Sequence, residues 1–128
     1  MDGVEIKFDA EELNTILDNA YEDVGKHTER VSLECSDEAV KALKDTSPRK
    51  KGDYAGGWDK QKAPDVDYGY VVWNAKHYQL THLLEKGHQV CNQFGGPWGR
   101  AAAHPHIRPV EQKMIPKYLS RIKDIKFR

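Results

Sequence analysis

The sequence lacks several features that define whole classes of protein. It has only two cysteines in 128 residues, Cys35 and Cys91, and they lie far apart in the chain. No apolar run approaches the roughly 18 residues that a membrane-spanning helix needs, and no apolar leader precedes the first helical pattern. We therefore expect no association with a membrane, no disulfide framework and a reducing cytosolic setting.

The chain also lacks a net charge, because 20 basic side chains balance 20 acidic ones. A net charge of zero argues against non-specific nucleic-acid binding as the main function. The charges are unevenly placed, since residues 1–47 are rich in Asp and Glu whereas residues 113–128 are rich in Lys and Arg. This asymmetry predicts either stacking of one subunit's acidic surface on another's basic surface, or a basic tail near DNA.

What is present predicts one α+β domain over residues 1–128. The length suits a single domain with a modest core. Helical patterns stand at both ends and strand patterns lie between them. We expect a long N-terminal helix and a C-terminal helix packed on a small, mainly antiparallel sheet, with a short helix between strands.

The N-terminal helix has the clearest pattern. Apolar residues between Leu13 and Ala42 recur every three or four positions, which is the spacing of one helix face. Asp9 is the predicted N-cap, Gly25 is a candidate bend, and Pro48 ends the helix. The apolar stripe is narrow, so the helix needs a partner surface, either the sheet of its own domain or a neighbouring subunit.

The middle of the chain predicts shorter elements. Strands are expected at about Tyr54–Lys62 and Tyr68–Asn74, the second being dense in aromatic and β-branched residues. A short helix is expected over Tyr78–Lys86, because its leucines have helical spacing and Gly87 stands where a C-cap falls.

Two segments that contain several glycines and prolines, residues 47–67 and 91–103, predict mobile loops. After the second loop, we expect Ile107 to begin a last strand or sheet edge. A final helix is predicted from Val110 to about Ile125, with Pro109 suited to its first turn.

Five of the six histidines lie between Trp73 and Pro109, which raises the hypothesis of a zinc site. Zinc takes nitrogen and sulfur donors in a tetrahedron. His104 and His106 would point the same way on a strand, which makes them the best local pair of zinc ligands. The spacings of the candidate residues do not match a familiar zinc-ligand pair. The candidate ligands are His77, His82, His88, Cys91, His104 and His106.

Acid–base or nucleophilic catalysis is a second hypothesis for this segment. Glu85 with His88, or Cys91 with a histidine, would need hydrogen-bond contact and a shifted pKa. No nucleophile-bearing turn or phosphate-binding glycine loop accompanies them. An alternative function therefore stays open: a small intracellular enzyme or zinc-binding protein that uses the His77–His106 segment.

A basic run at Arg49, Lys50 and Lys51 stands next to Tyr54 and Trp58. Basic residues contact phosphates and aromatic rings stack on bases, so the run is a candidate nucleic-acid contact. A three-residue run suits the wall of a passage that DNA traverses better than a tight, specific site.

Aromatic residues are also candidate interface anchors. Trp98 and Arg100 lie in the glycine-rich segment Phe94–Arg100, which we expect to form a variable surface loop. Trp73 is expected in the core rather than at an interface. The aromatic candidates together are Tyr54, Trp58, Tyr70, Trp73 and Trp98.

Four motifs in a fixed order carry a family resemblance. They are Pro-Arg-Lys-Lys-Gly-x-Tyr-Ala-x-x-Trp at residues 48–58, Val-Val-Trp-Asn at 71–74, Tyr78–His88, and Pro-His-Ile-Arg-Pro at 105–109. With this order, the chain resembles the small head–tail joining proteins (neck or tail-completion proteins) of long-tailed bacteriophages and their prophages, of the gene-product-ten type of the HK ninety-seven phage. The resemblance extends from about residue 10 to the C-terminal helix.

The resemblance implies a structural protein with no catalysis, no required cofactor and no small-molecule substrate. It implies a homo-oligomeric ring at the capsid–tail junction, in contact with head-completion or adaptor proteins and with tail-terminator or tail-tube proteins. Double-stranded DNA would pass non-specifically through the lumen. The protein would assemble in the bacterial host cytoplasm and end in the virion neck. The positions that would define the fold are Asn74, Tyr78, Leu84, Glu85, Gly87, His88, Pro105, Ile107 and Pro109.

Overall fold

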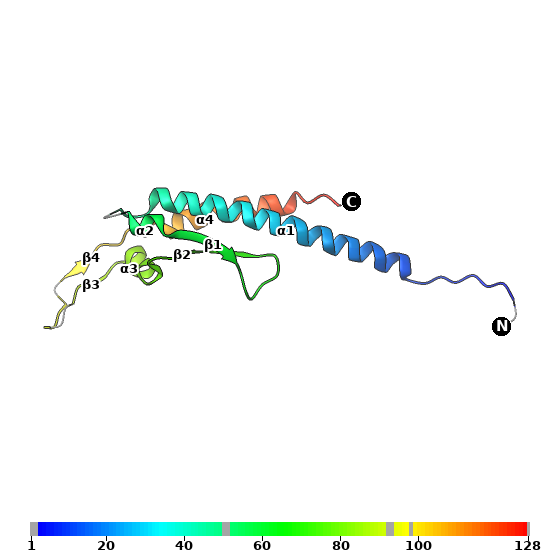
Figure 1. The fold of residues 1–128 in the computed structure, drawn as a ribbon, viewed down its shortest axis with the longest axis horizontal. Helices are drawn as coiled ribbons and strands as arrows, with labels where there is room; N and C mark the ends of the chain where they lie inside the picture. Colours follow the sequence, from blue (N-terminus) through cyan, green and yellow to red (C-terminus); the bar gives the residue numbers. More distant parts are fainter. Residues whose placement is uncertain (1–2, 50–51, 92–93, 98, 128) are drawn as a thin grey trace.

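The computed structural model describes residues 3–49, 52–91, 94–97 and 99–127. Two long helices lie side by side, and small strands lie beneath them (Figure 1). This α+β arrangement confirms the predicted class. The elements are α1 (Glu11–Thr46), α2 (Asp53–Gly56), β1 (Trp58–Lys62), β2 (Tyr70–Asn74), the 3₁₀ helix η1 (Tyr78–Leu80), α3 (Thr81–Lys86), β3 (His88–Gln89), β4 (Arg100–Ala101) and α4 (Ile107–Lys123).

Helix α1 forms where its apolar spacing predicts it. Ala10 rather than Asp9 is the N-cap residue, but the Asp9 carboxylate still accepts the N–H of Glu11 at 3.0 Å. At the other end Ser47 is extended, with ψ 149°, as the residue before a proline prefers. Gly25 does not interrupt the helix. A Cβ there would lie 2.6 Å from Cζ of Tyr68, so this glycine allows the β1–β2 loop to approach α1.

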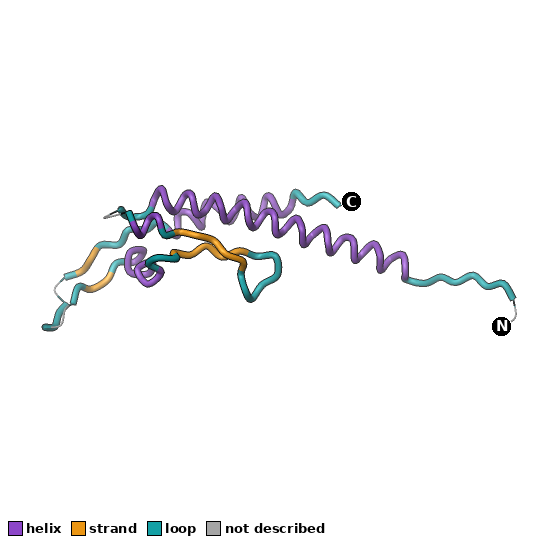
Figure 2. Tube along the Cα trace, in the orientation of Figure 1, coloured by secondary structure: helices purple, strands orange, loops and turns teal. Residues whose placement is uncertain are grey.

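The C-terminal half of α1 packs on α4 and on the β1–β2 hairpin (Figure 2). The hairpin is antiparallel, with Trp58 opposite Asn74 and Lys62 opposite Tyr70. One buried cluster joins the three parts, and smaller apolar residues such as Ala39 and Val72 extend it. Its buried members are Val31, Cys35, Leu43, Tyr54, Trp58, Val110 and Met114.

Three boundary predictions are wrong. The strand predicted from Tyr54 begins at Trp58, because residues 53–56 form the short helix α2. Within the predicted loop 91–103, Arg100–Ala101 pairs with His88–Gln89 as a second antiparallel ladder. Ile107 begins α4 rather than a strand. Pro109 does lie in the first turn of α4, as predicted, where the missing N–H costs no helical hydrogen bond.

The N-terminal part of α1 extends beyond the rest of the molecule (Figure 1). All of residues 3–24 are described, and none of them is buried. We call residues 11–24 the α1 arm. No helix of the described residues is long and apolar enough to cross a membrane.

Candidate functional site

Buried polar side chains connect α2, β2, α3 and the start of α4. Asn74 and His106 are 1% and 2% exposed, and Ser47 is also buried. Buried polar groups are costly unless they are hydrogen-bonded. Each of these three side chains has partners, and those partners include Tyr54, Trp58 and Glu85 of the resemblance motifs.

Tyr54 and His106 form the centre of this network. Nδ1 of His106 lies 2.6 Å from the carbonyl oxygen of His104, and since a carbonyl can only accept, Nδ1 carries the hydrogen. In a neutral ring, Nε2 then accepts the hydroxyl hydrogen of Tyr54, at 2.7 Å. Burial, followed by the nearby charge of Glu85, raises the pKa of Tyr54 to about 12. The hydroxyl therefore remains a donor at neutral pH.

Glu85 caps α4 from a distant position in the chain. Its Oε2 accepts the backbone N–H groups of His106 and Ile107 at 2.8 and 2.9 Å, and its Oε1 accepts that of Arg108 at 2.9 Å. Burial by itself would raise the pKa of Glu85, but the three backbone N–H donors outweigh it and hold this pKa below its ordinary value. A carboxylate also suits the positive end of a helix dipole. Glu85 thus acts as an architectural group.

Asn74 holds two turns together. Its Nδ2 donates to the carbonyl of Tyr54 at 2.7 Å, and its Oδ1 accepts the N–H groups of Lys76 and His77 at 3.3 and 2.9 Å. A Cβ at Gly57 would lie 2.5 Å from Oδ1 of Asn74, so only glycine fits beside the buried amide. The amide locks α2 to the turn after β2.

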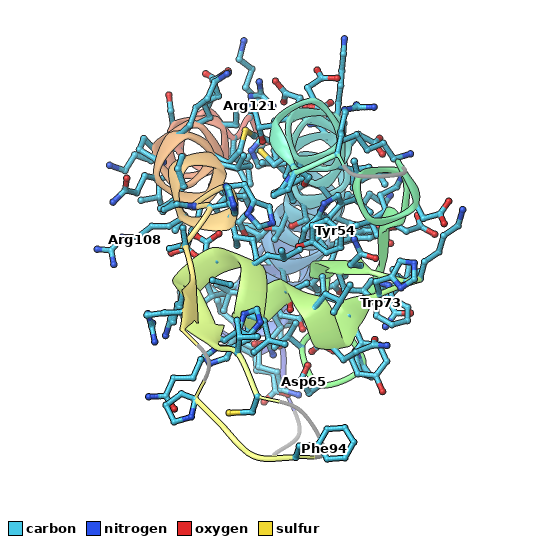
Figure 3. All side chains as sticks on the ribbon, turned by 90° about the vertical axis from the view of Figure 1, so that its left-hand side faces the viewer. Tyr54, Asp65, Trp73, Phe94, Arg108 and Arg121 are labelled. Carbon is cyan, nitrogen blue, oxygen red and sulfur yellow. The ribbon has the colours of Figure 1, made fainter. Side chains whose placement is uncertain are left out.

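The aromatic predictions are partly wrong. Tyr54 and Trp58, candidates for an interface or a DNA passage, are core residues that are 8% and 4% exposed. Nε1 of Trp58 donates to Oγ of Ser47 at 2.7 Å. Trp73, expected in the core, is 36% exposed. Figure 3 shows Tyr54 between the helices and the strands and Trp73 at the outer edge of the sheet.

The basic candidates do not form a cluster in the described part of the chain. Arg49 is exposed and donates to the carbonyl of Lys44 at 2.6 Å. Arg100 lies on β4 and donates to the carbonyl of Lys86 at 3.1 Å. The remaining candidates, Lys50, Lys51 and Trp98, lie outside the described residues.

The other signature positions lie around α3. Tyr78 is exposed at the start of η1, whereas Leu84 packs against the core. Gly87 ends α3 with φ 75°, and a Cβ there would lie 2.6 Å from the carbonyl oxygen of Ala101. These contacts give Gly87 the turn role that the sequence predicts. Pro105 precedes the capped residues His106 and Ile107 at the entry to α4.

The proposed zinc and catalytic residues do not converge. Among the described residues, no group of three or more His, Cys, Asp or Glu side chains is placed to hold a metal ion. His104 and His106 do not lie on a strand; His104 is exposed and His106 is buried. His88 is half-buried, and its Nδ1 has no hydrogen-bond partner among the described atoms. Both carboxylate oxygens of Glu85 are occupied by backbone N–H groups.

The second candidate site is an exposed apolar face on the α1 arm. Its side chains recur every three or four residues and are between 43% and 65% exposed. The sequence predicts this stripe and its need for a partner, but it does not show that the C-terminal half of α1 is buried within the chain while this face stays exposed. Tyr21 of this face hydrogen-bonds the side chain of Tyr68 in the β1–β2 loop. The members are Leu13, Ile16, Leu17, Tyr21 and Val24.

The chain exposes more surface than a compact monomer does. Its accessible surface is 9980 Å², whereas a compact monomer of 14.6 kDa has about 6,900 Å². Part of this excess of roughly 3,000 Å² comes from the α1 arm, and part comes from the extended residues 3–10 that precede it.

No family model, no curated protein and no solved structure matches this chain. The features of the chain that bear on its function are therefore the polar network, the exposed arm and the four ordered motifs.

Proposed function

We propose that the protein is a structural subunit of the phage neck, which self-associates into a ring at the junction of capsid and tail. The observation that carries this proposal is the exposed apolar face of the α1 arm. Contiguous exposed apolar side chains on a protruding helix are typical of surfaces that a partner covers. A ring of identical subunits offers such a partner.

The polar network supports a structural role for the resemblance motifs. Tyr54, Asn74, Glu85 and His106 hydrogen-bond to one another or to backbone groups, and these bonds join α2, β2, α3 and α4. The polar groups of these side chains therefore serve to stabilise the fold. This supports a connector without catalysis or cofactor, whose lumen passes double-stranded DNA and whose ends contact head-completion and tail proteins.

The test is deletion of the gene from the phage or prophage that carries it, with electron microscopy of the lysate. The proposal expects filled heads and separate tails that do not join, with joining restored by the gene supplied in trans. Mass spectrometry of purified virions should detect the protein at the copy number of a ring. Normal yields of joined virions from the deletion strain would overturn the proposal.

Metal analysis tests the alternative of a zinc-binding protein. The structural proposal expects substoichiometric zinc in protein purified without chelators. Stoichiometric zinc that is lost in the His104→Ala variant would instead favour the alternative.

A further inference from the structure

We infer that the α1 arm of one subunit docks into a groove between α4 and β2 of the next copy of the chain. This inference rests on the proposed ring and names the two surfaces that build it. The α4–β2 groove is an open cavity of about 480 Å³ with a mostly apolar lining that also contains Ser32, Ser36 and Glu111. The lining includes Val71, Val72, Val110, Met114, Ile115 and Tyr118.

The arm has the shape of a helix that fits a groove. Leu13, Leu17 and Val24 lie on one side of it, the arrangement that helix-in-groove recognition uses as anchors. Residues 11–24 span about 21 Å at the helical rise, and the 17 residues of α4 span about 25 Å. The two lengths match well enough for the arm to lie along α4.

The groove also needs a cover. Ile115 of α4 is 50% exposed and Val71 of β2 is 38% exposed, although both line the same cavity as the buried residues Val110 and Met114. Leu119, one turn beyond Ile115, is 50% exposed. An apolar helix placed here would extend the core that α1 and α4 already form.

Charge identifies the occupant as a second copy in a head-to-tail arrangement. Residues 9–25 hold six carboxylates and no Lys, Arg or His, whereas residues 107–123 hold five Lys or Arg against Glu111 alone. Two of these five, Lys117 and Arg121, pair with Glu38 of α1, and Arg108, Lys113 and Lys123 remain to face an acidic arm. Figure 3 shows Arg108 pointing away from the body beside α4. Pairing two arms with each other would bring like charges together, which is unfavourable. Arm on groove joins opposite charges and repeats from subunit to subunit, as a ring requires.

The experiment is sedimentation velocity of the full chain over a range of concentrations. Leu17→Glu places a charge on the arm and Ile115→Glu places one in the groove; both sites are exposed, so the fold should survive, as circular dichroism would check. We expect each variant to weaken self-association by at least about thirtyfold, the effect of losing an interface hot spot. Thr15→Glu and Ser120→Glu add the same charge to exposed positions away from the two surfaces and should assemble like the wild type.

Mixing the two defective variants separates the arrangements. Each keeps one intact surface, so an equal mixture of Leu17→Glu and Ile115→Glu should form heterodimers at concentrations at which either variant alone stays monomeric. Ile115→Glu assembling like the wild type would instead indicate arm-to-arm pairing and would overturn the inference. A wild-type chain that stays monomeric at millimolar concentration would overturn it as well, while the gene-deletion test would still decide the neck role separately.

Discussion

Glu85 joins two parts of the chain through hydrogen bonds that a neutral side chain replaces poorly. Its carboxylate accepts three backbone N–H groups at the start of α4. We expect Glu85→Ala to lower the free energy of unfolding by about 2 kcal/mol and Glu85→Gln by about 1 kcal/mol. Urea denaturation followed by circular dichroism measures both, with the exposed Glu111→Gln as a control that should change little.

The effect of Glu85 should depend on pH. Because its pKa is lower in the folded chain than in the unfolded one, its contribution is fully present above the ordinary Glu pKa of about 4.3. That contribution is lost as the pH falls through the lowered pKa. The difference in stability between wild type and Glu85→Gln should therefore shrink on acidification below pH 4. A difference that stays constant from pH 7 to pH 3 would contradict the capping role of the charge.

Tyr54 should make the fold sensitive to alkali. Its pKa is raised to about 12, mainly by burial, so the folded chain keeps a proton that the unfolded chain loses above about pH 10. Stability from this group is therefore complete below pH 10, and up to about 2 kcal/mol of it is lost as the pH rises toward 12. Denaturation at pH 8, 10 and 11 should show a steeper loss for wild type than for Tyr54→Phe. Parallel pH profiles would argue against a buried, hydrogen-bonded hydroxyl.

Residue chemistry was only partly readable from the sequence. Gly87 has the backbone conformation that its position after a short leucine-rich helix predicts. Glu85 is a different case, because its partners lie more than twenty residues away and no local pattern indicates a cap supplied across the fold. The same is true of His106, whose ring bonds to the hydroxyl of Tyr54 far away in the chain as well as to the neighbouring carbonyl of His104. The spacing of these residues suggested catalysis or metal binding, but in the structure their hydrogen bonds stabilise the fold.

Among the elements, α1 combines two environments in one uninterrupted helix. Its apolar periodicity predicted the helix from end to end, because helix formation depends on spacing that is local in sequence. Which half is covered depends on where α4 and the hairpin fold back, and periodicity carries no such information. The strand boundary at Trp58 was missed for a similar reason, since α2 is held by the buried amide of Asn74 twenty residues later.

The close contact between Gly25 and Tyr68 should be measurable as an interaction between α1 and the β1–β2 loop. In a free helix, Gly→Ala stabilises by about 1 kcal/mol. At Gly25 the new Cβ would meet the Tyr68 ring, so we expect the single variant Gly25→Ala to gain little or to lose stability. In a Tyr68→Ala background, the full gain of about 1 kcal/mol should appear. Equal gains in the two backgrounds would show that this contact does not form in solution.

At the scale of the whole molecule, the main property of the chain is its division into the exposed α1 arm and a packed body, which consists of the described residues from Gly25 onward. The body contains every buried residue among those described, and the arm contains none. Local opening should therefore cost little in the arm and much in the body. By hydrogen–deuterium exchange in dilute solution, amides of residues 11–24 should exchange quickly, whereas those of residues 31–43 should be protected.

Raising the protein concentration should protect the arm amides as subunits associate, and the Thr15→Glu control should behave in the same way. Leu17→Glu should leave the arm unprotected at all concentrations. Strong protection of the arm in a dilute monomer would contradict the exposed state seen here and would indicate that the arm folds back on its own body.

The Gly25–Tyr68 contact has a mechanical consequence. It lies where the arm leaves the body, and α1 crosses this point without a break. Where the arm is helical, it therefore continues α1 in one direction, which the loop beneath Gly25 helps to fix. A contact at the end of the arm would therefore also set the orientation of the body attached to it. In this way a single contact far from the core would determine the angle between successive subunits.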